Sequence, residues 1–133
     1  MRLVLDTNLL VSALLKPGSV PGRLLTMIWE GAAVALYDVR VTDEYRAVLA
    51  RPKFRSIDRA RIDQVFARLL AQGEEIAQLA EWQGAMKDED DRIFVEVALA
   101  GRADAIVTGN LKDYPQHLGF DVHPPATVLA MLA

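Results

Sequence analysis

Acidic residues recur at four places along the chain, and each place falls where a strand or a helix is expected to begin or end. Asp6 follows a short apolar run, Glu44 lies where a helix is predicted to open, Asp91 closes the acidic run at 88–91, and Asp113 follows another apolar run. Carboxylates that meet in a small volume repel one another, and their pKa values rise. A divalent cation relieves this repulsion, and with bound water it can assist hydrolysis of a phosphodiester.

The rest of the composition restricts the choice of metal. The chain has 133 residues, no cysteine and two histidines, His117 and His123, both near its C-terminus. Thiol nucleophiles and thiolate zinc sites are therefore excluded, and a histidine acid–base pair is disfavoured. A metal site in this chain must be built from oxygen ligands, which favours Mg²⁺ or Mn²⁺.

Each acidic residue also has a purely structural explanation. Carboxylates at helix N-termini bind free backbone N–H groups and suit the helix dipole, which would account for Glu44 and for Asp88 with Asp91. Asp6 could simply mark the point where a strand reaches solvent. The two interpretations differ in whether these residues converge in space. Their spacing permits convergence without proving it.

Strands alternate with helices along the sequence. Apolar runs predict strands at 2–5, 33–37, 76–79, 105–107 and 121–123, and helices at 9–15, 23–30, 43–50 and 126–132, with two more opening at 58 and within 88–91. This alternation indicates an α/β fold with a mainly parallel sheet. Sites in such sheets lie beyond the carboxyl ends of the strands, where Asp6 and the turn at 108–110 both fall.

Length and composition indicate one globular domain over residues 1–133, with 52% hydrophobic and 25% charged residues. No signal-peptide pattern and no apolar stretch of the roughly 18 residues that span a bilayer are present. We therefore expect a cytoplasmic protein that does not bind membranes. The apolar residues of the second helix can serve as core or as an interface between copies: Leu24, Leu25, Met27 and Ile28.

Four segments together resemble the PIN-domain family of metal-dependent ribonucleases. They are LVLDTN at 3–8, TDEYRAVL at 42–49 followed by RPKF at 51–54, KDEDDRIFVEVA at 87–98 and ADAIVTGNLKDYP at 103–115. They occur in the family's order and span nearly the whole chain. Within the family, the chain is most similar to the VapC-like toxins of toxin–antitoxin systems.

The resemblance implies a PIN-like three-layer α/β/α sandwich with a mainly parallel central sheet. It also implies an endoribonuclease toxin that requires Mg²⁺ or Mn²⁺, frequent homodimers and a small antitoxin protein as partner. It assigns catalysis to three carboxylates, which are Asp6, Glu44 and Asp91. Metal binding is assigned to these three with Asn110 and Asp113.

Short polar side chains beside these positions suit supporting roles, in which they orient a ligand or bind a water. They are Asn8, Thr108 and Asp88. For Asn8, capping of the first helix explains the residue equally well, and Thr108 also suits a plain turn.

The fourth segment departs from the family at one position. Where the family often has Thr-Gly-Asp, this chain has Asn110. An amide keeps a neutral oxygen ligand but loses the charge, and Asp113 could restore a carboxylate through a water. We therefore expect one well-held metal ion rather than a symmetric pair.

Basic residues concentrate between positions 46 and 61, where six lysines and arginines accompany one acid, Asp58, in a chain of net charge −3. Such a patch can hold RNA phosphates on either side of a scissile bond, and it is equally a solvated surface. Because Arg46 and Arg51 are predicted to share a helix with Glu44, we expect them to face the site. The proposed RNA-binding residues are Arg46, Arg51, Lys53 and Arg55.

Two other functions fit parts of this pattern. One is a non-catalytic RNA-binding or protein-interaction module with a weakened metal site, which Asn110 alone supports. The other is an aspartyl phosphohydrolase on a similar α/β fold, since Asp6 also ends a first strand there. That chemistry would require an aspartate in place of Asn8 and a lysine partner, and the chain offers neither convincingly.

Overall fold

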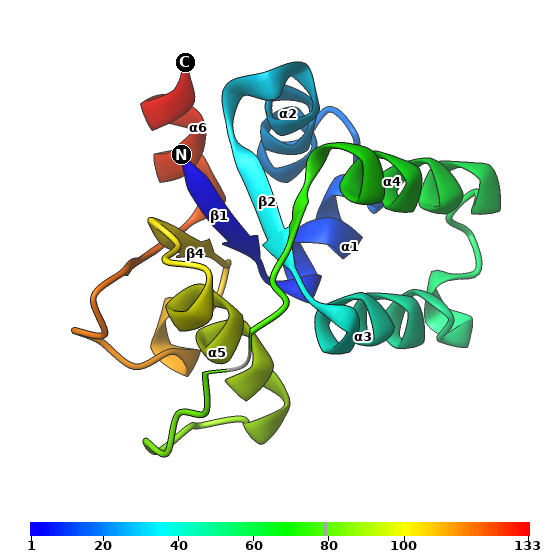
Figure 1. Cartoon of the computed structure of the whole chain (residues 1–133). Helices are drawn as coiled ribbons and strands as arrows, with labels where there is room; N and C mark the ends of the chain where they lie inside the picture. Colours follow the sequence, from blue (N-terminus) through cyan, green and yellow to red (C-terminus); the bar gives the residue numbers. More distant parts are fainter. Residues whose placement is uncertain (79) are drawn as a thin grey trace.

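A computed structural model describes residues 1–78 and 80–133. Within these residues, five parallel strands form one sheet in the order β3-β2-β1-β4-β5, and Figure 1 shows β1 at the centre with β2 and β4 beside it. The strands are β1 (Arg2–Leu5), β2 (Val34–Tyr37), β3 (Glu74–Glu75), β4 (Ala105–Val107) and β5 (Asp121–His123). The predicted α/β/α sandwich with a parallel sheet is therefore confirmed.

In the part of the chain that the structure describes, six α-helices connect and cover these strands. They are α1 (Thr7–Leu15), α2 (Val20–Met27), α3 (Val39–Leu49), α4 (Arg59–Gln72), α5 (Arg92–Ala100) and α6 (Pro125–Leu132). The connections from β1 to β2 and from β2 to β3 step one way across the sheet, whereas the connection from β3 to β4 steps back. Because such crossovers are right-handed, α5 lies on the face opposite to α1 and α2, where it packs against β1, β2 and β4.

The strand order reverses at β1, which pairs with β2 on one side and with β4 on the other. In an open parallel sheet, a crevice forms outside the carboxyl ends of the strands at such a reversal. Asp6 follows the last residue of β1, and Thr108 follows the last residue of β4. The topology therefore brings these two residues together although 102 positions separate them.

Several predicted boundaries were wrong, and in each case a capping residue explains the difference. α1 begins at Thr7 because the carboxylate of Asp6 accepts a hydrogen bond from the Asn8 N–H, so neither Thr7 nor Asn8 is the cap. α2 begins at Val20, where Ser19 caps it. α3 begins at Val39 because Asp38 accepts a hydrogen bond from the Val41 N–H. Glu44 consequently lies in the second turn of α3 rather than at its start.

The third strand also differs from its prediction. It is formed by Glu74–Glu75 rather than by residues 76–79, and the last predicted position, Leu79, lies outside the described residues. Ile76 follows the strand, and its backbone N–H still bonds to the carbonyl of Tyr37 at 2.7 Å. The prediction followed the apolar residues within 76–79, whereas the strand is formed by the two exposed glutamates that precede them.

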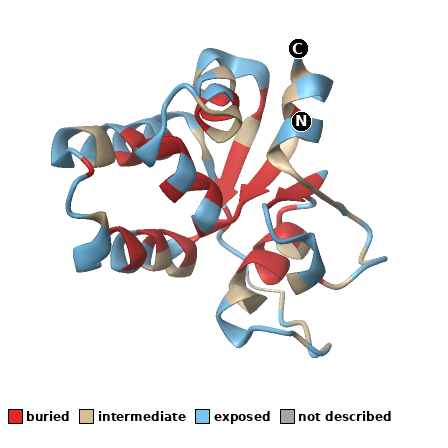
Figure 2. Cartoon of the chain, turned by 180° about the vertical axis from the view of Figure 1, so that it is seen from behind, coloured by how far each residue is buried: buried red, intermediate tan, exposed pale blue. Residues whose placement is uncertain are grey.

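The core lies between the sheet and its helices, and the central strands are buried along their length (Figure 2). Leu24, Leu25 and Ile28 of the second helical segment are buried in this core, so these three residues stabilise the single chain. In the described part of the chain, no helix has the length and apolar character needed to cross a membrane.

Candidate active site

Asp6 is held in a fixed orientation at the carboxyl edge of the sheet. Its side chain is buried, with 4% of the residue exposed. One oxygen, Oδ2, accepts hydrogen bonds from the Thr108 hydroxyl at 2.7 Å and from the Tyr114 hydroxyl at 3.0 Å. The other oxygen, Oδ1, accepts from the Asn8 N–H at 3.2 Å. Among the described residues, no lysine, arginine or histidine forms an ion pair with this carboxylate.

Asp38 shows how the same fold treats a comparable carboxylate. It follows β2 as Asp6 follows β1, it caps the next helix, and it is equally buried at 5% exposure. Arg40, however, lies 2.8 Å from its Oδ2 and neutralises it. Burying a carboxylate without a counterion is costly, and among the described residues Asp6 lacks the cationic partner that Asp38 has.

Glu44 and Asp91 belong to the same acidic neighbourhood. Partial burial, together with the charges of Asp6, Asp88, Asp113 and Asp90 in that order of effect, raises the pKa of Asp91 to about 7. Burial also raises the pKa of Glu44, assisted by Asp90, Asp88 and Asp6, while Arg51 opposes the shift. The charge of Asp6 thus contributes to the raised pKa values of both Glu44 and Asp91, so the three carboxylates belong to one acidic neighbourhood at the carboxyl edge of the sheet.

The capping explanation holds for only some of the acidic residues. Asp88 caps the 3₁₀ turn Glu89–Asp91, because its side chain accepts from the Asp90 N–H at 3.0 Å. Asp91 occupies the cap position of α5, yet its side chain makes no capping bond. Glu44 is inside a helix and caps nothing. Within the described residues, helix capping therefore explains neither the Asp91 nor the Glu44 carboxylate.

Three further residues that the sequence analysis predicted for the site are Asn110, Asp113 and Asn8. Asn110 donates its backbone N–H to the Thr108 hydroxyl at 3.0 Å, and its side chain is exposed. Asp113 is 3.6 Å from the Lys87 ammonium and acts electrostatically on Asp91. Asn8 contacts Asp6 through its backbone, and its residue is exposed. Their roles as metal ligands or supporting groups stay predictions.

Two tyrosines that the sequence analysis did not single out hold the site together. Tyr114 is buried and bonds directly to Asp6, and burial together with the Asp6 charge raises its pKa, so it stays a neutral donor. Tyr45 is buried beside Glu44, donates to the Leu5 carbonyl and stacks on Phe94. Asp38 was missed as well. A buried tyrosine hydroxyl needs a partner, but the sequence does not say which one.

The donor set fits a hard divalent cation. Within residues 1–78 and 80–133, no three acidic or histidine side chains are grouped closely enough to bind one metal ion as they stand. Mg²⁺, however, keeps several waters in proteins and contacts only one or two carboxylates directly. A looser set of carboxylates, in which neighbouring charges raise the pKa values of Glu44 and Asp91, suits such an ion, which would relieve the repulsion.

The basic residues divide into two groups. Arg51 lies near enough to Glu44 to lower its pKa, and it precedes the 3₁₀ turn Pro52–Phe54 rather than sharing α3 with Glu44, so the predicted common helix was wrong. The Arg46 guanidinium lies 4.4 Å above the Phe66 ring, where it helps α3 pack on α4. Lys53 lies above the ring of Phe54. Arg51 is therefore the basic residue best placed beside the acidic edge.

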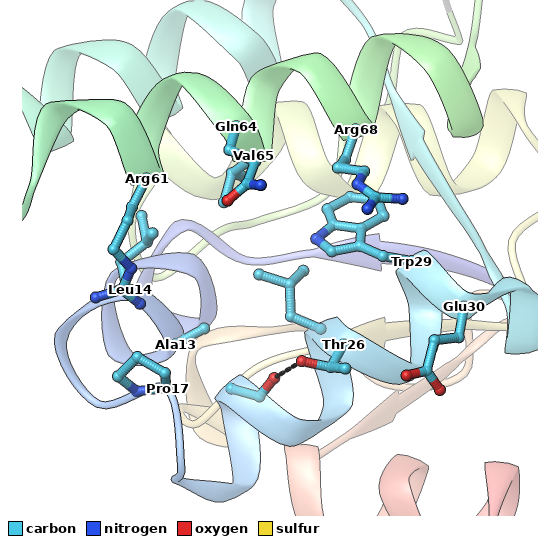
Figure 3. Close-up of a pocket in the computed structure, with 12 residues that line it drawn as sticks. Ala13, Leu14, Pro17, Thr26, Trp29, Glu30, Arg61, Gln64, Val65 and Arg68 are labelled. Atoms are coloured by element: carbon cyan, nitrogen blue, oxygen red, sulfur yellow. Dashed lines mark hydrogen bonds between the residues drawn. The ribbon is translucent and has the colours of Figure 1, made fainter.

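A groove of about 320 Å³ lies apart from this edge, between α4 and the α1–α2 pair (Figure 3). Leu14, Leu25, Trp29 and Val65 supply apolar lining, and Arg61 with Arg68 projects from α4. No residue of the acidic neighbourhood lines the groove. It is therefore not part of the candidate active site.

Comparison with known proteins settles the family. The sequence model described as the PIN domain matches residues 2–112, most of the chain and all four acidic segments up to Lys112. The chain belongs to the PIN-domain family. PIN domains are generally nucleases, so the chain is a nuclease-type domain.

Two further proteins are similar to this chain. Uncharacterized protein MJ1680 of Methanocaldococcus jannaschii is 29% identical to this PIN domain over 112 residues, which are 83% of this chain and 71% of that protein. A chain in the crystal structure of VapBC2 from Rickettsia felis, bound to a DNA fragment from their promoter, has a TM-score of 0.63 at 17% identity. The match covers 93% of this chain and 98% of that one. It shows that the two chains share a fold.

Proposed function

We propose that this PIN-domain protein is a metal-dependent endoribonuclease, the toxin component of a toxin–antitoxin pair. The observation that carries the proposal is the buried Asp6 carboxylate, which has neutral hydrogen-bond donors and no cationic partner in the described part of the chain. Glu44 and Asp91, whose pKa values are raised, adjoin it. A divalent cation is the simplest partner for such a group.

Asp6, Glu44 and Asp91 would hold Mg²⁺ or Mn²⁺, directly or through water. When bound, the ion supplies a water of lowered pKa and offsets charge on the phosphoryl oxygens. Thr108 and Tyr114 fix the orientation of Asp6, and Tyr45 fixes α3 against β1. Asn110 and Asp113 are proposed as weaker ligands that act through water.

RNA would approach from the side of Arg51. Its charge lies beside the acidic edge, and Lys53 and Arg55 are exposed in the adjoining turn. Phosphate contacts of this kind position a strand without reading its sequence. Arg46 is proposed to contribute less, because its guanidinium packs on Phe66.

A small antitoxin protein is the proposed partner. We also propose that the protein forms a homodimer and is located in the cytoplasm. The fold shared with a chain of VapBC2 and the resemblance to VapC-like toxins support such a partner. Arg61 and Arg68 form no ion pair in the described part of the chain, and the groove between them and α1–α2 has an apolar lining (Figure 3). An acidic segment with apolar side chains would fit it.

The decisive experiment compares wild type and Asp6→Asn in cleavage of a mixed-sequence RNA with Mn²⁺, Mg²⁺ or chelator present. We expect cleavage only for wild type and only with metal. Metal-dependent cleavage that survives Asp6→Asn would refute the mechanism. Mn²⁺ binding without cleavage of any RNA would favour the alternative, a non-catalytic module with a weakened site.

A further inference from the structure

An ion pair ties α3 to α5 close to the acidic edge. Nη1 of Arg40, near the start of α3, lies 2.7 Å from Oε1 of Glu96 on α5. Glu96 is buried, with 8% of the residue exposed. Its second oxygen accepts a hydrogen bond from the Trp82 backbone N–H at 3.0 Å. Both oxygens of this carboxylate therefore have fixed partners.

Arg92 links α5 to the 3₁₀ turn Glu89–Asp91 and to Trp82 before it. It donates to the Trp82 carbonyl at 2.7 Å and to both carboxylate oxygens of Glu89 at 2.7 and 2.8 Å. Its guanidinium also lies 5.2 Å from the centre of the Trp82 ring. Glu89 opens the turn that ends at Asp91, so α5 and the residues before it are held as one unit.

Each residue of the Arg40–Glu96 ion pair lies a short distance along the chain from one of the two carboxylates, Glu44 or Asp91. Arg40 precedes Glu44 by four residues, and Glu96 follows Asp91 by five, which correspond to about 6 Å and about 7.5 Å along the helix axes. A helix is stiff over such a length. A contact that fixes the helices at Arg40 and Glu96 therefore also fixes the separation of Glu44 and Asp91.

We propose that Glu96 and Arg40 are positioning residues that set the separation of the Glu44 and Asp91 carboxylates for binding one divalent cation. This inference rests on the proposed metal-dependent function. Arg40 is partly exposed and Glu96 is buried, and an ion pair taken out of water stabilises a fold little better than apolar side chains of similar size. A functional site, by contrast, requires its groups to be held within about 0.5 Å, which gives this pair a purpose beyond stability.

Two variants of Glu96 separate position from charge. Glu96→Gln removes the charge and leaves the Arg40–Asp38 pair in place, whereas Glu96→Asp keeps the charge but is too short to reach both Arg40 and Trp82. We expect both variants to bind Mn²⁺ about 10-fold to 100-fold more weakly in calorimetric titration, the usual effect of losing a supporting contact at a metal site. If only local charge matters, Glu96→Asp should bind Mn²⁺ as wild type does.

Glu74→Gln is the matched control. Glu74 pairs with Arg2 at 2.6 Å, at the amino ends of the strands and thus opposite to Asp6. We expect this variant to keep wild-type Mn²⁺ affinity even if its melting temperature falls. Arg40→Lys provides an independent test, because one ammonium group cannot serve Asp38 and Glu96 as the guanidinium does, and we expect its affinity for Mn²⁺ to fall as well.

The inference is overturned if the Glu96 and Arg40 variants fold and bind Mn²⁺ like wild type, or if Glu74→Gln loses the same affinity. Glu96→Asp with wild-type affinity would also overturn it. Wild type that binds no Mn²⁺ would reject the metal-dependent function together with this inference. Wild type that binds Mn²⁺ and cleaves RNA, with unaffected variants, would reject the inference alone.

Discussion

Asp6 and Asp38 follow neighbouring parallel strands and cap the helices that come next, but among the described residues only Asp38 pairs with an arginine. The two residues are almost equally buried. Their local structure is the same, and their electrostatic surroundings differ. This difference predicts opposite responses when each charge is removed.

Asp38→Asn should destabilise the fold, whereas Asp6→Asn should not. An asparagine still caps a helix, but Arg40 would lose a charged partner, and hydrogen bonds to charged groups contribute about 1.5–3 kcal/mol. We expect a fall in melting temperature of about 3–8 °C for Asp38→Asn. Asp6→Asn should melt at or above the wild-type temperature in chelator and lose Mn²⁺ binding. Equal destabilisation by both would contradict the distinction.

The metal-free protein should become less stable as the pH rises. The pKa of Asp91 in the folded protein is about 7, above its ordinary value of 3.8. The unfolded chain therefore loses this proton first, so stability declines between about pH 4 and pH 7 and then levels off. The raised pKa of Glu44 acts in the same direction. Melting temperatures measured in chelator across this range test the sign.

Asp91→Asn isolates this contribution. We expect it to raise the melting temperature in chelator by about 3–5 °C at pH 8 and to change it little near pH 4. Added Mn²⁺ should stabilise wild type more at pH 8 than at pH 5, and it should not stabilise the variant. A variant with the pH profile of wild type would show that Asp91 is not the titrating group.

Tyr114→Phe tests the hydroxyl that bonds to Asp6. The phenyl ring keeps the packing, and only the donor to Oδ2 is lost. We expect Mn²⁺ affinity to fall about 10-fold, as for other contacts that orient a metal ligand. Thr108→Val removes the second donor to the same oxygen and should act similarly. Unchanged affinity in both variants would show that Asp6 needs neither bond for metal binding.

Asn110→Asp tests the position where this chain departs from its family. The added carboxylate would join an edge where acidic neighbours already raise the pKa of Asp91. We expect a lower melting temperature in chelator and tighter Mn²⁺ binding, or a second bound ion per chain. Calorimetric titration gives both affinity and stoichiometry. A variant with no change in either would place residue 110 outside the metal centre.

Arg51 and Arg46 should differ in RNA binding. Arg51→Gln removes a charge beside Glu44, so RNA affinity should fall and its dependence on salt should become shallower by about one unit of log–log slope. Arg46→Gln removes the contact with Phe66 and should lower the melting temperature with a smaller effect on RNA. If Arg46→Gln weakens RNA binding more than Arg51→Gln does, the bound RNA lies along α3 instead.

The sequence by itself determined the fold class, the parallel sheet and the acidic segments. Apolar strands end in polar residues at 6 and 108, and the alternation of strands with helices forces a parallel sheet with its site at the carboxyl edge. It did not determine helix starts such as Asp38, because aspartate at that position suits a turn, a cap or an ion pair equally well.

Only the tertiary structure decided which acidic residues have partners. Asp38 meets Arg40, Glu96 meets Arg40 and Trp82, and Asp6 meets two hydroxyl groups and no cation among the described residues. Tyr114 reaches Asp6 from 108 positions away. Such pairings depend on how helices pack on opposite faces of the sheet. Electrostatic energy depends on distance in space, and distances between residues far apart in sequence exist only after folding.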